Sequence, residues 1–239
     1  MHKPIIFYDM EGTLFRKSTI AVDGRVSPSA WNALHHTLGP VAEAEGREGM
    51  RRWNTGEFAG FVEWVDYAVE IFKRHKLTRE MFERVLHSIE FNPGVLEVFD
   101  ALRGKYRTAL ISGGLKAQAD IAQKTLKINH AFAACELFWN DDGSLAHWNS
   151  LPCDYEGKVD FMGLIMKEHK VDPKDCYFVG DGINDVLLAQ AVGTSIAFNG
   201  HPDLQKVATH QINQPEGQED FRAVLEFMRS LLSRETQKS

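Results

Sequence analysis

Short runs of consecutive apolar residues recur along the chain, and each run ends in a polar segment. They are rich in β-branched and aromatic side chains and do not alternate with polar residues, which is typical of strands in a parallel sheet covered on both faces. We therefore expect a buried parallel sheet whose strands include the runs at 5–8, 109–111, 176–179 and 195–198.

Amphipathic helical patterns fill much of the sequence between and after these runs. Their apolar residues recur every three or four positions and so fall on one face of a helix. This alternation of strand and helix predicts an α/β fold, a three-layer sandwich built on a parallel, Rossmann-like sheet. The expected helices cover 93–104, 115–127, 158–170 and a C-terminal segment from Phe221 to Leu232.

The stretch from residue 16 to residue 91 departs from this alternation, because it has several helical patterns and no convincing strand. Ser27 followed by Pro28 resembles a helix N-cap with proline at the first helical position. We predict an all-helical cap domain at 16–91, inserted after the first strand, and an α/β core domain formed by 1–15 and 92–239.

A β-hairpin is predicted at 136–149. The tetrapeptide Asn-Asp-Asp-Gly at 140–143 lies there between two segments rich in aromatic residues. Asn, Asp and Gly tolerate the backbone angles that tight hairpin turns need.

Charge and cysteine content exclude some partners and compartments. The chain has 27 basic and 33 acidic side chains and a formal net charge of −6, so we expect neither nucleic acid nor a membrane as a partner. No apolar stretch is long enough to span a bilayer, and the N-terminus lacks the pattern of a signal peptide. Three scattered cysteines without metal-ligand spacing favour a reducing compartment, so we expect a cytoplasmic protein.

Three of the apolar runs end in polar residues that can carry chemistry. In open α/β sheets, ligands bind beyond the carboxyl ends of the strands, so we expect these three loops to meet at one site. Asp9, Asp181 and Asp185 offer the hard oxygen ligands that Mg²⁺ prefers. Ser112 and Gly113, at the end of another run, offer a hydroxyl and backbone N–H groups that suit phosphate.

These residue types together suit phosphoryl chemistry. A carboxylate beside a bound phosphoryl group can attack phosphorus and form an aspartyl-phosphate. A second acid two residues after Asp9, Glu11, can protonate the leaving oxygen and then activate water. Each element alone has an ordinary explanation, since Asp-Gly pairs also occur at 23–24 and 142–143 and commonly form turns. Three such loops following three strands in order favour a functional site.

The same residues resemble the four motifs of the haloacid dehalogenase-like superfamily. The spacing is similar to that of its phosphoserine-phosphatase-like branch, in which a helical cap lies between the first and second motifs. The resemblance covers nearly the whole chain and implies a Mg²⁺-dependent phosphomonoester hydrolase. The matching segments are Asp9-x-Glu11-Gly12-Thr13, Ser112-Gly113-Gly114, an isolated Lys158 and Gly180-Asp181-Gly182-x-Asn184-Asp185.

The resemblance implies a role for each matching residue. Asp9 would be the nucleophile and a metal ligand, and Glu11 would be the general acid/base and lend its backbone carbonyl to the metal. Lys158 would neutralise the phosphoryl oxygens and the nucleophile, although a solvated surface lysine is the alternative. Asp181 would ligate the metal, and Asp185 would do so directly or through water. The implied phosphate-binding residues are Thr13, Ser112, Gly113, Lys158 and Asn184.

Two features depart from that branch. The second acid of the first motif is usually Asp, whereas Glu11 is longer by one methylene, a change that active members of the superfamily also carry. Authentic phosphoserine phosphatases hold their substrate with an acid after the first motif and an arginine in the cap, but the corresponding places here fall near Ser18 and Ala68. Phosphoserine is therefore a secondary candidate substrate.

The expected cap also carries three arginines and a set of aromatic residues. Arg47, Arg51 and Arg52 could bind a substrate carboxylate, but a solvated helix face explains them more simply. The aromatic residues recur at helical spacing, which favours a cap core over a surface for a large apolar leaving group. They are Trp31, Trp53, Phe58, Phe61, Trp64 and Tyr67.

We expect a phosphatase, a monomer or a homodimer, that acts on a small phosphorylated metabolite through an aspartyl-phosphate. Three alternatives stay open at this point: a phosphoserine phosphatase proper, a phosphotransferase and a catalytically weak phosphate-binding protein. Release of free phosphate separates the hydrolases from the other two.

Overall fold

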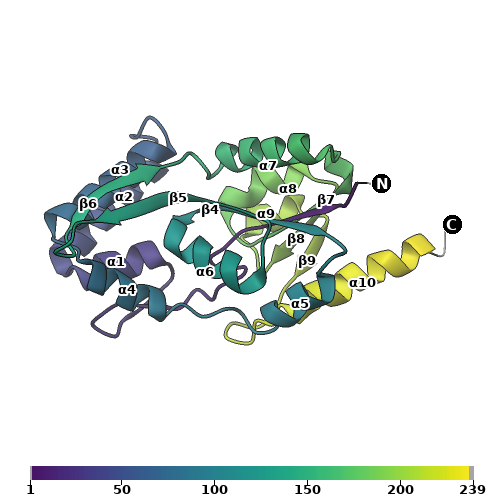
Figure 1. Ribbon diagram of the computed structural model, residues 1–239, viewed down its shortest axis with the longest axis horizontal. Helices are drawn as coiled ribbons and strands as arrows, with labels where there is room; N and C mark the ends of the chain where they lie inside the picture. The colour runs from purple at the N-terminus through teal and green to yellow at the C-terminus, as the bar shows by residue number, and fades with distance from the viewer. Residues whose placement is uncertain (1, 237–239) are drawn as a thin grey trace.

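The computed structural model describes residues 2–236 of the chain, with side chains up to residue 231. The molecule is elongated, with a helical group at one end and the C-terminal helix at the other (Figure 1). The last residue of the expected C-terminal stripe, Leu232, lies outside the described side chains.

The centre of the molecule is a seven-stranded sheet in the order β6-β5-β4-β1-β7-β8-β9. Every neighbouring pair is parallel except β5 and β6, which are antiparallel. The prediction of a parallel sheet is confirmed. The strands are β1 (Ile5–Tyr8), β4 (Arg107–Leu115), β5 (His130–Trp139), β6 (Leu145–Ser150), β7 (Cys176–Gly180), β8 (Thr194–Phe198) and β9 (His210–Ile212).

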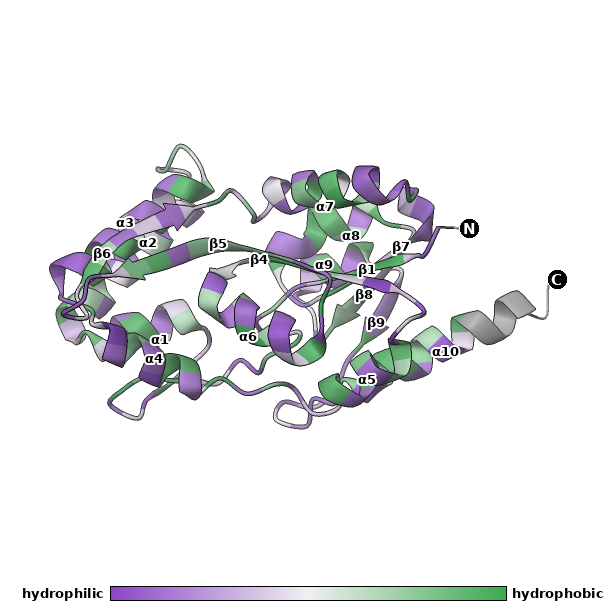
Figure 2. Cartoon of the chain, viewed as in Figure 1, coloured by the Kyte–Doolittle hydropathy of each residue, from purple (hydrophilic) through white to green (hydrophobic). Residues whose placement is uncertain are grey.

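Helices cover both faces of the sheet, as expected for a three-layer sandwich. Along β1, Ile5 and Phe7 face one apolar core, and Ile6 and Tyr8 face the other. All four side chains are buried, which explains why this strand is apolar throughout rather than alternating. Figure 2 shows hydrophobic strands at the centre. One face carries α5 (Val95–Leu102), α6 (Lys116–Leu126) and α10 (Arg222–Thr236), and the other carries α7 (Glu156–His169), α8 (Val186–Ala191) and α9 (Pro202–Val207).

Four further helices follow β1 in the chain and gather at the end of the molecule opposite α10 (Figure 1). A helical insertion after the first strand is therefore present, as predicted. The helices are α1 (Ala30–Thr37), α2 (Pro40–Asn54), α3 (Phe61–Arg74) and α4 (Arg79–His87).

The expectation that this insertion contains no strand is wrong. A two-stranded antiparallel hairpin, β2 (Thr19–Ile20) and β3 (Val26–Ser27), precedes the first cap helix. Its turn is formed by Gly24, whose φ of 88° favours glycine. Ser27 lies in β3, so the N-cap of α1 is Ser29, whose side chain accepts a hydrogen bond from the backbone N–H of Asn32.

The predicted hairpin at 136–149 is confirmed by β5 and β6. It reaches from the sheet to the helical insertion (Figure 1), where Asp66 of α3 accepts hydrogen bonds from Trp148 Nε1 at 2.7 Å and from Ser150 Oγ at 2.6 Å. These bonds attach the insertion to the core sheet. Within the described residues, no helix combines the length and the apolar character needed to cross a membrane.

Candidate active site

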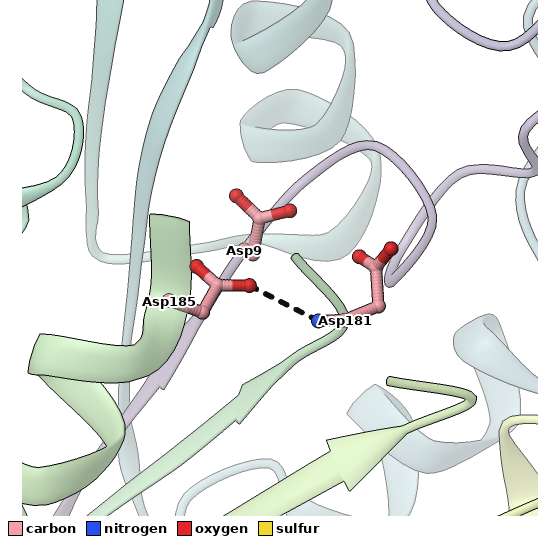
Figure 3. A group of neighbouring side chains, drawn as sticks. All are labelled: Asp9, Asp181 and Asp185. Atoms are coloured by element: carbon pink, nitrogen blue, oxygen red, sulfur yellow. Dashed lines mark hydrogen bonds between the residues drawn. The ribbon is translucent and has the colours of Figure 1, made fainter. Parts of the chain in front are cut away.

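Three buried aspartates lie together at the carboxyl ends of β1 and β7 (Figure 3). Asp9 directly follows β1, Asp181 directly follows β7, and Asp185 ends the 3-10 turn Ile183–Asp185. One carboxylate oxygen of each lies within 4.8 Å of the others. The convergence arises because β1 and β7 are adjacent and in register, with Tyr8 opposite Val179.

Lys158 joins two of these carboxylates. Its Nζ atom lies 2.7 Å from Asp9 Oδ1 and 2.6 Å from Asp185 Oδ1, and its side chain has no exposed surface. Burial opposes the charge of Lys158, but Asp185, Asp9 and Asp154 together raise its pKa well above the usual value. The lysine is therefore charged, and the alternative of a solvated surface lysine is wrong. It lies in the first turn of α7, which begins two residues earlier than expected.

The loop after β7 is held by its own side chains. Asp185 Oδ2 accepts hydrogen bonds from the backbone N–H groups of Asp181 at 3.0 Å and of Gly182 at 2.9 Å, the first of which is drawn in Figure 3. Thr13 donates from its hydroxyl to Asp181 Oδ1 at 2.8 Å. The ammonium group of Lys17 forms an ion pair with Asp181 Oδ2. Asp181 thus has a fixed orientation.

The donor set suits a hard divalent cation. Burial is the main cause that raises the pKa of Asp9, and the neighbouring Asp185 and Asp181 add to it despite the opposing Lys158. The three carboxylates face two ammonium groups, those of Lys158 and Lys17, so the site keeps an excess of negative charge. Carboxylate oxygens grouped in this way are the ligands that Mg²⁺ takes in proteins, usually with several waters retained.

Glu11 connects the core to the first cap helix. Its Oε1 atom accepts a hydrogen bond from the backbone N–H of Ala30 at 2.7 Å and a longer one from Gln118 Nε2 at 3.4 Å. Ala30 is the first residue of α1, where unpaired N–H groups favour a carboxylate. Burial raises the pKa of Glu11 to about 7, so both protonation states are accessible near neutrality.

The segment expected as a phosphate-binding turn belongs to the end of β4. Ser112, Gly113 and Gly114 continue the strand, and its pairing with β5 shifts register between Ser112 and Leu115. The expected turn is therefore wrong in its secondary structure. A Cβ atom on Gly113 would overlap the carboxylate of Asp154, so any larger residue here would have to displace that side chain.

A cavity of about 260 Å³ lies between these loops and the cap helices. Six predicted site residues line it, whereas Thr13, Lys158 and Asp185 are fully buried and not among its lining residues. Those three side chains do not face the cavity but bond to residues that do: Lys158 to Asp9, and Thr13 and Asp185 to Asp181. The six that line the cavity are Asp9, Glu11, Ser112, Gly113, Asp181 and Asn184.

The sequence interpretation missed several residues of this cavity, among them Asp154, Tyr155 and Lys17. Asp154 accepts a hydrogen bond from Asn184 Nδ2 at 2.6 Å and lies four residues before Lys158, a spacing that could have identified it. Tyr155 adopts a φ of 47° and accepts a hydrogen bond from Trp53 Nε1 at 3.3 Å. Lys17 had only its place shortly after the first motif as a signal.

The residues at the expected substrate-binding places do not line this cavity. Ser18 lines a different cavity, which Asp181 also lines, and Ala68 is buried inside the cap. All six aromatic residues of the cap belong to the hydrophobic core or pack against it, as expected, and four of them also line the cavity. The four that line the cavity are Trp31, Trp53, Phe61 and Trp64. The rings of Phe58 and Tyr67 pack instead against the guanidinium group of Arg52.

Comparison with known proteins supports the interpretation of the site. Residues 4–193 match the haloacid dehalogenase-like hydrolase family, and the chain belongs to this family. It is similar to the phosphoserine phosphatase of Idiomarina loihiensis, with 28% identity over 214 residues that cover 87% of this chain and 88% of that protein. It is also similar to the phosphoserine phosphatase of Lactococcus lactis, with 26% identity over 160 residues, 66% of this chain and 72% of the other.

Solved structures show the same fold. A phospho-aspartyl intermediate analogue of phosphoserine phosphatase superposes with a TM-score of 0.74 at 23% identity and covers 95% of this chain and 99% of its own. An unliganded probable phosphoserine phosphatase from Vibrio cholerae gives 0.71 at 19% identity, over 88% of this chain and 61% of that one. The predictions of a phosphatase, of the phosphoserine-phosphatase-like branch and of its fold are confirmed.

Proposed function

We propose that the chain hydrolyses small phosphomonoesters with Mg²⁺ through a phosphorylated Asp9. The observation that carries this proposal is the position of Asp9 at the end of β1. There, one carboxylate oxygen is held by Lys158 and the residue faces a cavity enclosed by the cap. A buried carboxylate beside a buried ammonium and two further acids suits transfer of a phosphoryl group to the carboxylate.

Asp9, Asp181 and the backbone carbonyl of Glu11 would hold the metal. When bound, Mg²⁺ would neutralise charge on the phosphoryl oxygens. Both carboxylate oxygens of Asp185 already accept hydrogen bonds, from Lys158 and from two backbone N–H groups. Asp185 also does not line the cavity, unlike Asp9 and Asp181, so we assign Asp185 to holding Lys158 and the Asp181 loop, with contact to the metal through water.

The first step forms a bond between Asp9 and phosphorus. Lys158 occupies Oδ1 of Asp9, so Oδ2 is the oxygen that attacks as the bond from phosphorus to the ester oxygen breaks. Glu11 in its protonated form gives its proton to the departing oxygen, which leaves as an alcohol. The bond from Glu11 to the N-terminus of α1 fixes the position of this carboxyl group.

The second step releases phosphate. Glu11, now a carboxylate, takes a proton from water while the water oxygen attacks phosphorus and the Asp9–phosphorus bond breaks. Ser112, the Gly113 N–H group and Asn184 line the cavity and would bind the phosphoryl oxygens. Thr13 is buried and donates to Asp181, so we assign it to orienting that metal ligand rather than to binding phosphate.

The decisive experiment measures phosphate released from p-nitrophenyl phosphate with Mg²⁺ present. The wild-type protein is expected to turn over, and Asp9→Asn is expected to lose all measurable turnover because an amide does not attack phosphorus. Asp120→Asn removes a carboxylate from an exposed ion pair on α6 and is the matched control. Removal of Mg²⁺ with a chelator is expected to abolish activity reversibly.

Three observations would contradict the proposal. Asp9→Asn with wild-type activity would exclude the phosphorylated intermediate. A wild-type protein that binds phosphate esters with Mg²⁺ but releases no phosphate would be a binding protein, and one that phosphorylates an added alcohol would be a phosphotransferase. Mass spectrometry of the acid-quenched enzyme should find the phosphoryl group on the peptide that contains Asp9.

A further inference from the structure

The cap side of the cavity is an apolar wall. Three cap helices contribute it, and its rings contact one another. The centroids of Trp31 and Trp64 are 5.2 Å apart, those of Trp64 and Phe61 are 5.4 Å apart, and those of Phe61 and Trp53 are 5.7 Å apart. Met50 extends the wall from α2. We call these five residues the aromatic wall.

Two of the three indole N–H groups of the aromatic wall are engaged in hydrogen bonds to the protein. Trp31 Nε1 donates to the backbone carbonyl of Gly113 at 3.3 Å, and Trp53 Nε1 donates to the hydroxyl of Tyr155 at 3.3 Å. Both bonds also connect the cap to the core. The two indoles therefore present ring surface rather than free donors to the cavity.

Among the residues whose side chains the structure describes, no arginine lines the cavity, and the three arginines of α2 have other partners. Arg47 pairs with Glu43, and Arg51 bonds to Glu48 and Glu57 on the helix surface. Arg52 lies 4.4 Å from the centroid of the Phe58 ring and pairs with Glu57 at 3.5 Å. The sequence expectation that a solvated helix face accounts for these arginines agrees with these contacts.

Within the described part of the chain, Lys17 is the one cation that lines the cavity, and it pairs with Asp181 at the phosphoryl end. A substrate carboxylate placed against the aromatic wall would lose its hydration without gaining an ionic partner, which is costly. An ammonium group there would find no carboxylate on the wall. A zwitterionic leaving group such as serine therefore fits this wall poorly.

We infer that the substrate is a phosphomonoester whose leaving group is uncharged and aromatic, with its ring against the aromatic wall. The inference rests on the proposed phosphatase activity. Ring stacking on tryptophan and phenylalanine supplies binding energy without ionic partners. It also accounts for the absence of charged residues at the places where phosphoserine phosphatases hold their substrate.

The test compares four esters of primary alcohols, so that the chemical reactivity of the leaving groups stays similar. They are 2-phenylethyl phosphate, ethyl phosphate, phosphoserine and phosphocholine. The value of kcat/KM for 2-phenylethyl phosphate is expected to exceed each of the others by at least about 10-fold, because filling a hydrophobic pocket discriminates to that extent. The same order is expected for Kd in the Asp9→Asn variant, where binding is measured without turnover.

Variants assign the preference to the wall. Trp53→Ala is expected to lower kcat/KM for 2-phenylethyl phosphate by about 10-fold more than it lowers kcat/KM for ethyl phosphate, mainly through KM. Phe138→Ala removes a ring that stacks on His147 in the hairpin, outside the cavity, and is the matched control. Met50→Arg, which adds a cation to the wall, is expected to improve phosphoserine relative to 2-phenylethyl phosphate.

The outcomes separate this inference from the proposed function. Phosphate release with phosphoserine preferred would overturn the inference and leave the phosphatase standing. A preference for phosphocholine would also overturn it, because the rings would then act as a cage for a cation. If no ester releases phosphate, the proposed function fails, and the Kd values for the Asp9→Asn variant still decide which leaving group the cavity prefers.

Discussion

The ammonium group of Lys158 donates to Asp9 Oδ1 at 2.7 Å from a side chain with no exposed surface. A buried lysine is rare unless it is paired, and here the same nitrogen also donates to Asp185. Its charge balances part of the negative charge on the buried acids. The same contact therefore serves both the stability of the site and the proposed chemistry at Asp9.

Replacing this lysine is expected to impair both functions. Lys158→Met keeps a long side chain but removes the charge, so kcat with p-nitrophenyl phosphate should fall at least about 100-fold. The free energy of unfolding should fall by about 3–5 kcal/mol, since buried carboxylates lose their partner. Steady-state kinetics and urea unfolding measure the two effects.

A surface lysine provides the comparison. Lys116 pairs with Asp120 one turn away on α6, where both side chains are partly exposed. Lys116→Met should change the free energy of unfolding by less than about 1 kcal/mol and leave kcat unchanged. If Lys158→Met behaved in the same way, the ion pair with Asp9 would contribute neither to the stability of the fold nor to kcat.

Two glycines of α7 are expected to respond in opposite directions to alanine. A Cβ atom on Gly157 would overlap the backbone carbonyl oxygen of Pro152, whereas one on Gly163 would meet no atom within 4 Å. Gly157→Ala should therefore destabilise the protein by about 1–3 kcal/mol and lower activity, since the neighbouring residue is Lys158. Gly163→Ala should stabilise it by about 0.5–1 kcal/mol, because alanine restricts the unfolded chain.

Thermal unfolding and phosphate release measured on both variants check this prediction. Equal effects of the two substitutions would mean that the close approach of Gly157 to Pro152 does not constrain α7. A stable Gly157→Ala variant with full activity would also show that Lys158 tolerates displacement of its helix.

The core of the site was predictable because it depends on local patterns. Asp9 and Asp181 each follow a fully apolar strand, and adjacent parallel strands bring such residues together whatever the rest of the chain does. Lys158 could be identified by its position, although its complete burial could not. The start of α7 ahead of this lysine depends on Tyr155, whose left-handed backbone has no sequence signal.

Other features depend on contacts between segments that are distant in sequence. Lys17 meets Asp181 only after the loop from β1 folds back over the sheet. The strands of the hairpin formed by Thr19–Ile20 and Val26–Ser27 are too short to show a periodic pattern. Which cap rings face the cavity depends on how α1, α2 and α3 pack together, and helical spacing alone gives the same stripe for a core face and for a cavity face.

The length of Glu11 is expected to matter because its carboxylate reaches the N-terminus of α1. Glu11→Asp should lose the bond to the Ala30 N–H group and move the proton donor by about 1 Å, which lowers kcat by about 100-fold. Glu11→Gln keeps the reach but not the proton. Its loss of kcat should be larger for an alkyl ester than for p-nitrophenyl phosphate, whose leaving group needs little protonation.

This comparison separates a chemical role from a structural one. If Glu11→Asp retained wild-type kcat, the reach of the side chain to α1 would be irrelevant to catalysis. If Glu11→Gln lost equal activity with both esters, Glu11 would not protonate the departing oxygen, and its role would be limited to the shared phosphate-release step or to positioning the cap. Circular dichroism of both variants confirms that the fold is intact.

His35 makes the stability of the cap depend on pH. It belongs to α1 and packs against α3. Its Nδ1 atom lies 2.8 Å from the backbone carbonyl oxygen of Trp31, and the centroid of its ring lies 4.9 Å from that of Phe72. Its Nε2 atom is buried and has no hydrogen-bond partner among the described residues. Burial lowers the pKa of His35 to about 4, and the hydrogen bond to Trp31 and the charge of Glu45 only partly oppose this.

The sign of the effect follows from linkage. Since the folded pKa lies below the unfolded value, the unfolded chain binds a proton first as pH falls, and stability is lost between about pH 6.5 and pH 4. One pKa unit corresponds to about 1.4 kcal/mol, so the full loss is roughly 3 kcal/mol. His35→Leu, which cannot protonate, should flatten this part of the curve of unfolding free energy against pH. The exposed His87 is the control: His87→Gln should keep the wild-type slope, and a wild-type slope in His35→Leu would show that other groups carry the dependence.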